Sequence, residues 1–210
     1  SQTEGKDSLM IAPTWTEIDS LNELTREKLK DAGKLSACEQ ELTSLKDQSW
    51  TLAERKNIRG YKGGETLLFH KKTRDFSKGE SVHVKSIEGE TLTVTKNDGS
   101  LAQITKRQAG AFSVCEEKPI QIAQGDKLRL LSSATDDKGI QLPNGSIITA
   151  KGISSHGHLI LEDGRQISSR HLAHGYALTS HASQGVTCDE VFIADAMSKQ
   201  GLYVSASRGR

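Results

Sequence analysis

HGYALTSHASQGVT at residues 174–187 and LYVSASRGR at residues 202–210 are the two stretches that decide the fold. The first predicts an apolar strand over 175–179, followed by a polar loop of the form T-x-H-x-x-Q-G-x-T. A further buried strand is expected over 189–194, and a last short strand begins at residue 202 and ends on Ser207-Arg208. T-x-H, Q-G and S-R are each common by themselves. The order in which these strands and polar loops follow one another, and not any single short motif, indicates the fold.

This series resembles motifs V and VI of superfamily 1 helicases. It is most similar to the RecD-like helicase portion of the conjugative relaxase-helicases, in which motif V is A-x-T-x-H-x-x-Q-G-x-T and motif VI is Y-V-x-x-S-R. Two further stretches resemble the same family: A-P-T at residues 12–14 with L-N-x-x-x-R at 21–26, and Y-x-x-G-E-x-x-x-F at 61–69. The resemblance implies the second RecA-like motor domain, an α/β fold of the P-loop NTPase type. It also implies an inserted all-β region, a small barrel of the Src-homology-3 type.

The resemblance also implies roles for particular residues. The residues implied to contact single-stranded DNA are Thr14, Thr179, His181 and Thr187. Those implied at the ATP are Gln184, Gly185 and Arg26, with Arg208 as the catalytic residue. The partners implied are single-stranded DNA and the first RecA-like domain of the same full-length chain, in a protein of conjugation and plasmid transfer.

Physical reasons support these roles. Compact polar side chains such as Thr179 and His181 suit contact with a phosphate backbone without base reading. Gly185 permits a tight backbone turn beside a nucleotide. A guanidinium at a strand end, as at Arg208, can stabilise charge that develops on a γ-phosphate, an effect worth roughly three orders of magnitude in related enzymes. Structural alternatives remain open: Thr14 as a plain helix cap and Arg26 as a solvated charge.

The amino-terminal part predicts strand, cap and helix. Residues 9–12 form an apolar run that Pro13 ends, and Thr14 with Glu17 makes a T-x-x-E capping box. An apolar stripe with nearly helical spacing then runs to Gly33; it consists of Ile18, Leu21, Leu24 and Leu29. A second helix is expected over 35–46 from Leu35, Cys38, Leu42 and Leu45, and Trp50-Thr51-Leu52 is expected to be extended.

Between residues 65 and 170 the pattern changes to short strands and turns. Strands are expected over 81–87, 91–95, 101–105, 146–153, 158–161 and 165–167, with Asn97-Asp98-Gly99 as a hairpin turn. The openings K-G-E at residue 78 and Q-G-D at residue 124 are alike, so two modules descended from one unit are an alternative to a single barrel. We therefore predict a discontinuous motor domain at 1–64 and 175–210, with the β region at 65–174 inserted.

The bulk composition excludes several classes of protein. The formal net charge is +1 and aromatic residues make up only 4% of the chain, which indicates neither a strongly basic nucleic-acid binder nor a disordered acidic chain. Three separate cysteines, Cys38, Cys115 and Cys188, have no C-x-x-C spacing, which favours a reduced, cytoplasmic protein. No membrane span or signal peptide is expected. The abrupt start and the end at the Ser-Arg motif suggest an excised piece.

No Walker A or Walker B sequence occurs, so we expect the piece alone to bind no ATP and Mg²⁺ and to hydrolyse none. In the full-length protein, ATP with Mg²⁺ is the implied cofactor. No metal site is expected: His156 and His158 lack a third ligand. Two rival functions stay open, a vestigial non-catalytic module that binds single-stranded DNA and a protein-docking module. Intact Walker sequences upstream of this chain would favour the active motor domain. The absence of salt-sensitive binding to labelled oligonucleotides would favour the protein-docking module.

Overall fold

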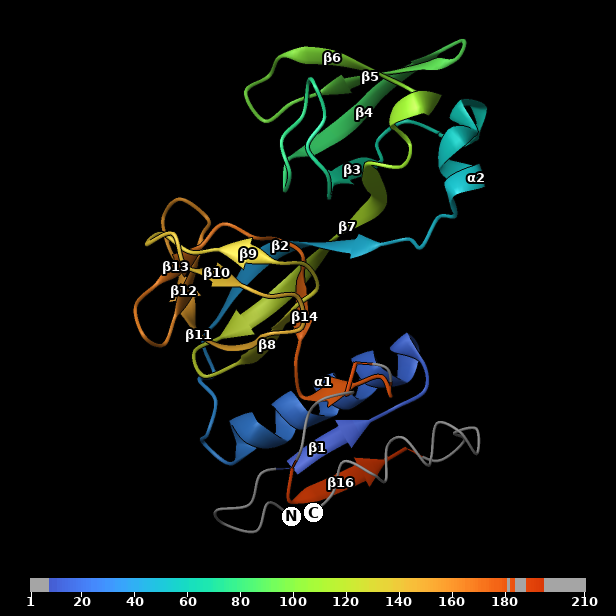
Figure 1. The fold of residues 1–210 in the computed structure, drawn as a ribbon. Helices are drawn as coiled ribbons and strands as arrows, with labels where there is room; N and C mark the ends of the chain where they lie inside the picture. Colours follow the sequence, from blue (N-terminus) through green and yellow to red (C-terminus); the bar gives the residue numbers. More distant parts are fainter. Residues whose placement is uncertain (1–7, 181, 184–187, 195–210) are drawn as a thin grey trace. The chain divides into compact units, whose positions relative to one another are not determined.

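The computed structural model describes residues 8–180, 182–183 and 188–194, which fall into two compact units (Figure 1). Unit 1 comprises residues 1–41, 121–168 and 172–210, and unit 2 comprises 42–120 and 169–171. The described part is mostly β-sheet with few helices. Its unit boundaries fall at 41/42 and 120/121, inside long strands. The predicted division at 64/65 and 174/175 stays a prediction.

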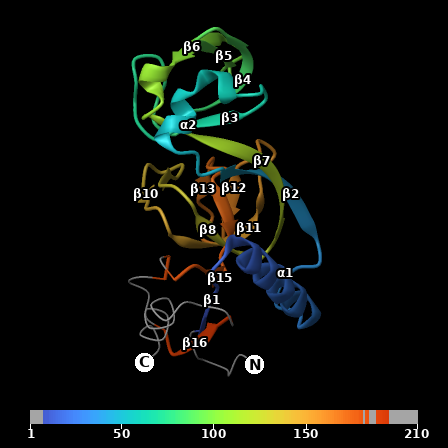
Figure 2. The ribbon, with the colours of Figure 1, turned by 90° about the vertical axis from the view of Figure 1, so that its right-hand side faces the viewer.

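Unit 1 contains a small parallel sheet with a helix beside it. Strand β1 (Ser8–Ile11) lies between β15 (Ala177–Leu178) and β16 (Glu190–Ile193), and it is parallel to both (Figures 1 and 2). Helix α1 (Trp15–Asp31) follows β1 directly. The expected strands near residues 9–12 and 189–194 are thus confirmed. The strand expected over 175–179 is present but covers only two residues.

Local sequence explains where α1 begins and ends. Thr14 is the N-cap in an extended conformation, and with Glu17 it forms the predicted capping box. At the other end Gly33 has a φ of 67°, a conformation that glycine adopts without steric cost. Lys28 and Lys30 in the last turn complement the negative end of the helix dipole.

The rest of unit 1 is antiparallel sheet. Five strands lie in the order β13 (Gln166–Ile167), β12 (Leu159–Leu161), β11 (Ile147–Ile153), β8 (Lys127–Leu130) and β14 (Leu172–His174). A two-stranded pair joins β9 (Ala134–Thr135) to β10 (Gln141–Leu142). The turns between these strands use glycine with positive φ, as at Gly145 and Gly164.

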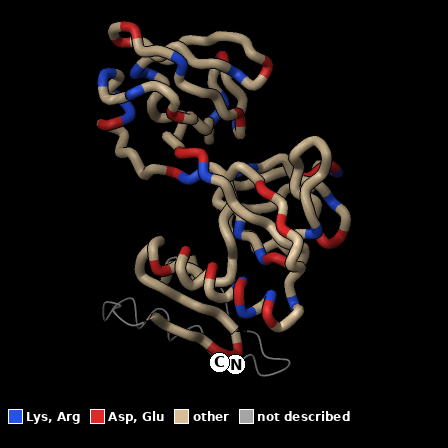
Figure 3. Tube along the Cα trace, turned by 180° about the vertical axis from the view of Figure 1, so that it is seen from behind, with Lys and Arg blue, Asp and Glu red and all other residues tan. Residues whose placement is uncertain are grey.

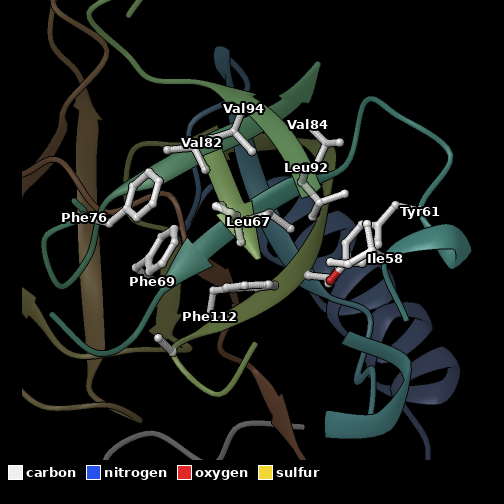
Figure 4. Packing of buried hydrophobic residues seen from close by; sticks show 13 residues of the cluster. Ile58, Tyr61, Leu67, Phe69, Phe76, Val82, Val84, Leu92, Val94 and Phe112 are labelled. Carbon is white, nitrogen blue, oxygen red and sulfur yellow. The ribbon is translucent and has the colours of Figure 1, made fainter. Parts of the chain in front are cut away.

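Unit 2 is built on a six-stranded sheet. The strand order is β2 (Glu39–Asp47), β7 (Phe112–Ala123), β3 (Thr66–Phe69), β4 (Ser81–Glu88), β5 (Thr91–Thr95) and β6 (Leu101–Thr105). Short helices α2 (Leu52–Lys56), η1 (Ile58–Gly60) and η2 (Lys106–Gln108) complete it. Its interior is apolar and includes Leu67, Phe69, Val82, Leu92, Val94 and Phe112 (Figure 4). The expected strands 91–95 and 101–105 are confirmed to the residue.

The helix expected over 35–46 is wrong. Residues 39–47 form strand β2, which is a neighbour of the twelve-residue strand β7. Along β2 Leu42, Ser44 and Leu45 are all buried, so the burial follows neither helical period nor strict alternation. Pairing with β7 satisfies the backbone of β2, and this long-range pairing outweighs a helical stripe of only four apolar residues.

The prediction that Trp50-Thr51-Leu52 is extended is wrong at its last residue. Thr51 is an N-cap, and helix α2 begins at Leu52. Thr51 and Glu54 form a capping box with the same hydrogen bonds as Thr14 and Glu17. The T-x-x-E signal was present in the sequence, but the short polar helix behind it has no apolar stripe to reveal it.

Candidate functional site

The carboxyl edge of the parallel sheet brings together residues from the two ends of the chain. Ile11 is in register with both Leu178 and Ile193. The backbone N–H of Ala12 donates to the carbonyl of Leu178 at 3.0 Å, and Ala194 N–H donates to Ile11 at 2.9 Å. Parallel strands end at a common edge, and in open α/β sheets this edge is where ligands bind. It is therefore the candidate site of unit 1.

Thr14 lies just beyond the end of β1, exposed at this edge. Its hydroxyl accepts the N–H of Glu17 at 3.3 Å and donates to Glu17 Oε2 at 2.7 Å, while Thr14 N–H donates to the same Oε2 at 3.1 Å. The helix-cap alternative for Thr14 is therefore correct as a description of its structure. Its predicted contact with DNA stays a prediction. The side chain is exposed, but its hydroxyl would have to turn from Glu17 to donate its single hydrogen to a phosphate.

Thr179 follows directly after β15 and begins a tight turn. Its Oγ1 accepts the N–H of Ala182 at 3.1 Å, and its carbonyl accepts the N–H of Ser183 at 3.0 Å. Ser183 is wholly buried, and its hydroxyl donates to the carbonyl of Ser180 at 2.8 Å. Thr179 thus caps this turn as a threonine caps a helix. The turn sits at the same sheet edge as Thr14.

Asn22 fixes the chain that leads into β15, a role that the sequence analysis missed. Its Oδ1 accepts the N–H groups of Tyr176 at 3.0 Å and Ala177 at 2.9 Å, and its Nδ2 donates to the carbonyl of His174 at 3.2 Å. Asn22 is only 2% exposed, so these three bonds satisfy a buried amide. Helix α1 therefore positions β15, and with it Thr179.

Arg26 lies one helical turn further along the same buried face and makes a different contact. Its Nε and Nη2 donate to the two carboxylate oxygens of Asp126, both at 2.9 Å, and Nη2 also contacts Glu39. Lys30 binds Glu39 as well, at 2.8 Å. Arg26 is 8% exposed, so the alternative of a solvated charge is wrong. A signal existed in the sequence: Ile18, Asn22 and Arg26 recur every four residues, which places the two polar side chains on the apolar face.

Asp126 is ionised in this setting. Burial by itself would raise its pKa, but the hydrogen bonds from Arg26, from the N–H of Ala123 and from the hydroxyl of Tyr176 hold that pKa below its usual range. Burial likewise favours a lower pKa for Arg26, and the two carboxylates reverse this and raise it. The pair is therefore charged on both sides. Burial also lowers the pKa of His174, which leaves its imidazole neutral at pH 7.

The described residues include three of the predicted site residues, Thr14, Arg26 and Thr179. Thr14 and Thr179 share the sheet edge. Arg26 is twelve residues beyond Thr14 on α1, about 18 Å along the helix axis, and its guanidinium is engaged by carboxylates. Its predicted role at ATP would require this ion pair to open, and it stays a prediction. The other predicted residues lie outside the described residues: His181, Gln184, Gly185, Thr187 and Arg208.

Two open pockets in unit 1 are separate from this edge. One of about 380 Å³ lies at the end of α1 and includes Lys34, Gly125 and Lys151. The other, of about 430 Å³, runs along α1 beside Met10 and Phe192. Within residues 8–180, 182–183 and 188–194, no three His, Cys, Asp or Glu side chains form a cluster that could hold a metal ion. No described helix is long and apolar enough to span a membrane.

Comparison with known proteins gives a weak structural likeness. No family model matches the chain, and no curated protein matches it significantly. Among solved structures, the chain is similar to Pif1 helicase from Bacteroides in complex with ADP-AlF3 and ssDNA, with 14% identity and a TM-score of 0.32 over 100% of this chain and 40% of that one. Pif1 helicase from Candida albicans matches with 14% identity and a TM-score of 0.32, over 100% of this chain and 44% of that one. The chain thus spans about two fifths of the length of these helicases.

Proposed function

We propose that the chain is the second motor domain of an ATP-dependent DNA helicase of the conjugative relaxase type, and that it binds single-stranded DNA at the carboxyl edge of β15 and β1. In this proposal Thr14 and Thr179 hold the phosphate backbone, together with His181 and Thr187. The RecA-like core is discontinuous, and the β-rich remainder is its insertion. The full-length protein would supply the first motor domain.

The observation that carries the proposal is the shared sheet edge. The T-x-H-x-x-Q-G-x-T stretch begins at a strand end, and that strand is parallel to β1, whose own end leads into the A-P-T stretch. Two stretches that resemble one family separately thus meet at the edge where α/β folds bind ligands. Hydroxyl groups at such a position suit contacts that do not depend on base sequence.

The nucleotide part of the proposal depends on the resemblance. Gln184, Gly185 and Arg208 would face ATP bound with Mg²⁺ between the two motor domains, and Arg208 would stabilise charge on the transferred phosphate. Arg26 is also among the residues implied to contact ATP, and it is the one of them that the structure describes. It binds Asp126, so the present arrangement gives it a structural role. ATP would supply the driving force for opening and closing the two domains on DNA.

The DNA contact can be tested by placing a negative charge at the edge without removing the helix cap. Aspartate is as good an N-cap as threonine, so Thr14→Asp keeps the capping position while its carboxylate repels a phosphate. Thr51→Asp is a matched control, because Thr51 is an exposed N-cap in a capping box of the same geometry. We expect Thr14→Asp to weaken binding of a labelled single-stranded oligonucleotide by about tenfold, or about 1.4 kcal/mol.

Fluorescence anisotropy across a salt series measures this, with thermal unfolding to confirm that both variants fold. Equal affinities for the two variants would show that the edge does not contact DNA. If the unaltered chain shows no salt-sensitive binding of single-stranded DNA at all, the docking alternative is correct and the helicase assignment is wrong.

A further inference from the structure

The charges of the chain are divided unevenly between the two units. Unit 2 contains 15 Lys and Arg against 10 Asp and Glu, a net charge of +5, although the whole chain has only +1. Unit 1 is correspondingly acidic. Figure 3 shows the basic positions distributed along the trace of unit 2. A positive unit attached to a negative one is suited to a local contact with a polyanion, which the overall composition conceals.

A dense cluster of positive charge in unit 2 lies in the loop from His70 to Lys78, between β3 and β4, which we call the basic loop. It reads HKKTRDFSK, with four Lys or Arg and one Asp. The side chains of Lys71, Lys72, Arg74 and Lys78 are all exposed. None of the four has an ion pair or side-chain hydrogen bond within the part of the chain that the structure describes. They are therefore available to an external anion.

The basic loop is held in a fixed conformation by its own Phe76. This ring is 2% exposed and stacks on Phe69, with 4.3 Å between ring centroids and 13° between planes (Figure 4). Lys96 Nζ lies 4.8 Å from the centroid of the same ring. Burying one aromatic ring in the core of unit 2 orders the backbone of the loop, so a ligand has to fix only the exposed side chains and not the loop itself.

Hydrogen bonds hold the start and the middle of the basic loop. The N–H of His70 donates to the carbonyl of Ala111 at 2.9 Å, and Lys71 N–H donates to the same carbonyl at 3.2 Å. Thr73 N–H donates to Phe76 O at 2.9 Å, and Phe76 N–H donates to Thr73 Oγ1 at 3.2 Å. Lys71, Lys72 and Arg74 thus extend from an ordered turn.

The side chains that the basic loop exposes indicate which form of DNA it suits, single-stranded or duplex. Proteins that grip single-stranded DNA add exposed aromatic side chains on which the bases stack. The one Phe, Tyr or Trp ring of the basic loop is the buried Phe76, and the imidazole of His70 at its start is the one exposed ring, so the loop offers several cations and little stacking surface. Such a surface suits the regular phosphate array of a duplex, in which the bases are already stacked inside.

We infer that the basic loop of unit 2 is a second nucleic-acid site, which binds the phosphate backbone of duplex DNA through Lys71, Lys72 and Arg74. This inference goes beyond the proposed function, because it concerns a different unit and a different form of DNA from the sheet edge at Thr14 and Thr179. In a protein that unwinds DNA, such a site would hold the duplex that has still to be separated.

The test is duplex binding by the variant Lys71→Ala/Lys72→Ala/Arg74→Ala. Its matched control is Lys118→Ala/Lys138→Ala/Lys151→Ala, which removes the same charge from three exposed lysines elsewhere. Fluorescence anisotropy with a blunt labelled duplex is measured across a salt series for both variants and for the unaltered chain. We expect the loop variant to lose at least about tenfold in duplex affinity, and its salt slope to fall by about 2 to 3, since each lost phosphate contact accounts for roughly 0.9.

The control should bind the duplex almost as the unaltered chain does. Equal losses in the two variants would show a general charge effect, and an unchanged loop variant would show no contact; either result overturns the inference. A loop variant that loses single-stranded and duplex DNA equally also overturns it. The proposed function is judged separately, because Thr14→Asp should reduce binding of single-stranded DNA and leave duplex binding unchanged.

Discussion

Two turns of this chain are built alike and used differently. In the Lys78-Gly79-Glu80 turn before β4, Gly79 has a φ of 86°, and Glu80 accepts the N–H of Ser77 at 2.7 Å. In the Gln124-Gly125-Asp126 turn before β8, Gly125 has a φ of 93°, and Asp126 accepts the N–H of Ala123 at 2.7 Å. Each acidic side chain thus closes the turn on the residue three positions earlier.

The two acids then meet different partners. Glu80 lies 3.4 Å from Lys96 Nζ with both side chains more than one fifth exposed, whereas the side chain of Asp126 is wholly buried against Arg26 of helix α1. A partly exposed pair contributes little to stability, because water screens it. In a buried pair, the loss of either partner leaves the other charge unpaired and away from water, which lowers the free energy of unfolding. The same local turn therefore closes a loop in unit 2 and anchors a helix in unit 1.

The largest effect expected from this comparison is that of Asp126→Asn. The change leaves the buried Arg26 guanidinium with Glu39 alone, and we expect a loss of about 3 kcal/mol in the free energy of unfolding. Glu80→Gln, the equivalent change in the other turn, should cost less than about 1 kcal/mol. Urea unfolding followed by circular dichroism measures both.

A double variant sharpens the test of Asp126. Asp126→Asn with Arg26→Met removes both charges and keeps an amide oxygen that can accept the Ala123 N–H, so it should recover much of the stability that Asp126→Asn alone loses, because no buried charge is left unpaired. Equal stability of Asp126→Asn and Glu80→Gln would show that the two turns do not differ as described.

The two glycines should respond alike. Gly79→Ala and Gly125→Ala both place a side chain at positive φ, which costs about 1 to 2 kcal/mol. A Cβ at Gly125 would lie 3.4 Å from the carbonyl oxygen of Lys34, an ordinary contact, and one at Gly79 would meet nothing within 4 Å. We expect similar shifts in the midpoint of thermal unfolding. A neutral result at either position would mean that its turn does not require the left-handed conformation.

The smallest effect is the acid dependence of stability. The pKa of Asp126 is lower in the folded chain than in the unfolded chain, so its contribution is present above the unfolded value of about 3.9 and is lost as the pH falls through the folded value. The unaltered chain should therefore lose stability below about pH 4 more steeply than Asp126→Asn. Urea midpoints measured between pH 2 and 6 check this, and parallel curves for the two proteins would contradict it.

Much of the secondary structure could be predicted because its signals are local. The hairpin strands 91–95 and 101–105 with their Asn-Asp-Gly turn, and the cap and glycine that bound α1, depend on contacts within a few residues. The strand at 39–47 could not be predicted in this way. Its partner β7 is far away in the sequence, and the spacing of its leucines imitates a helix. The edge that joins Thr14 to Thr179 was expected only through resemblance.

The sequence by itself determined the capping box and the glycine that bound α1, the turns, the alternation of strands in the β-rich part and the turn that begins at Thr179, because each of these needs only neighbouring residues. The tertiary structure alone decided that Arg26 pairs with Asp126, that Asn22 holds the entry to β15, and that Phe76 turns inward while the cations of the basic loop stay exposed. These partners lie far apart in the sequence or depend on burial. A buried polar group must find its hydrogen bonds wherever the fold brings donors and acceptors together, and no local spacing specifies that place.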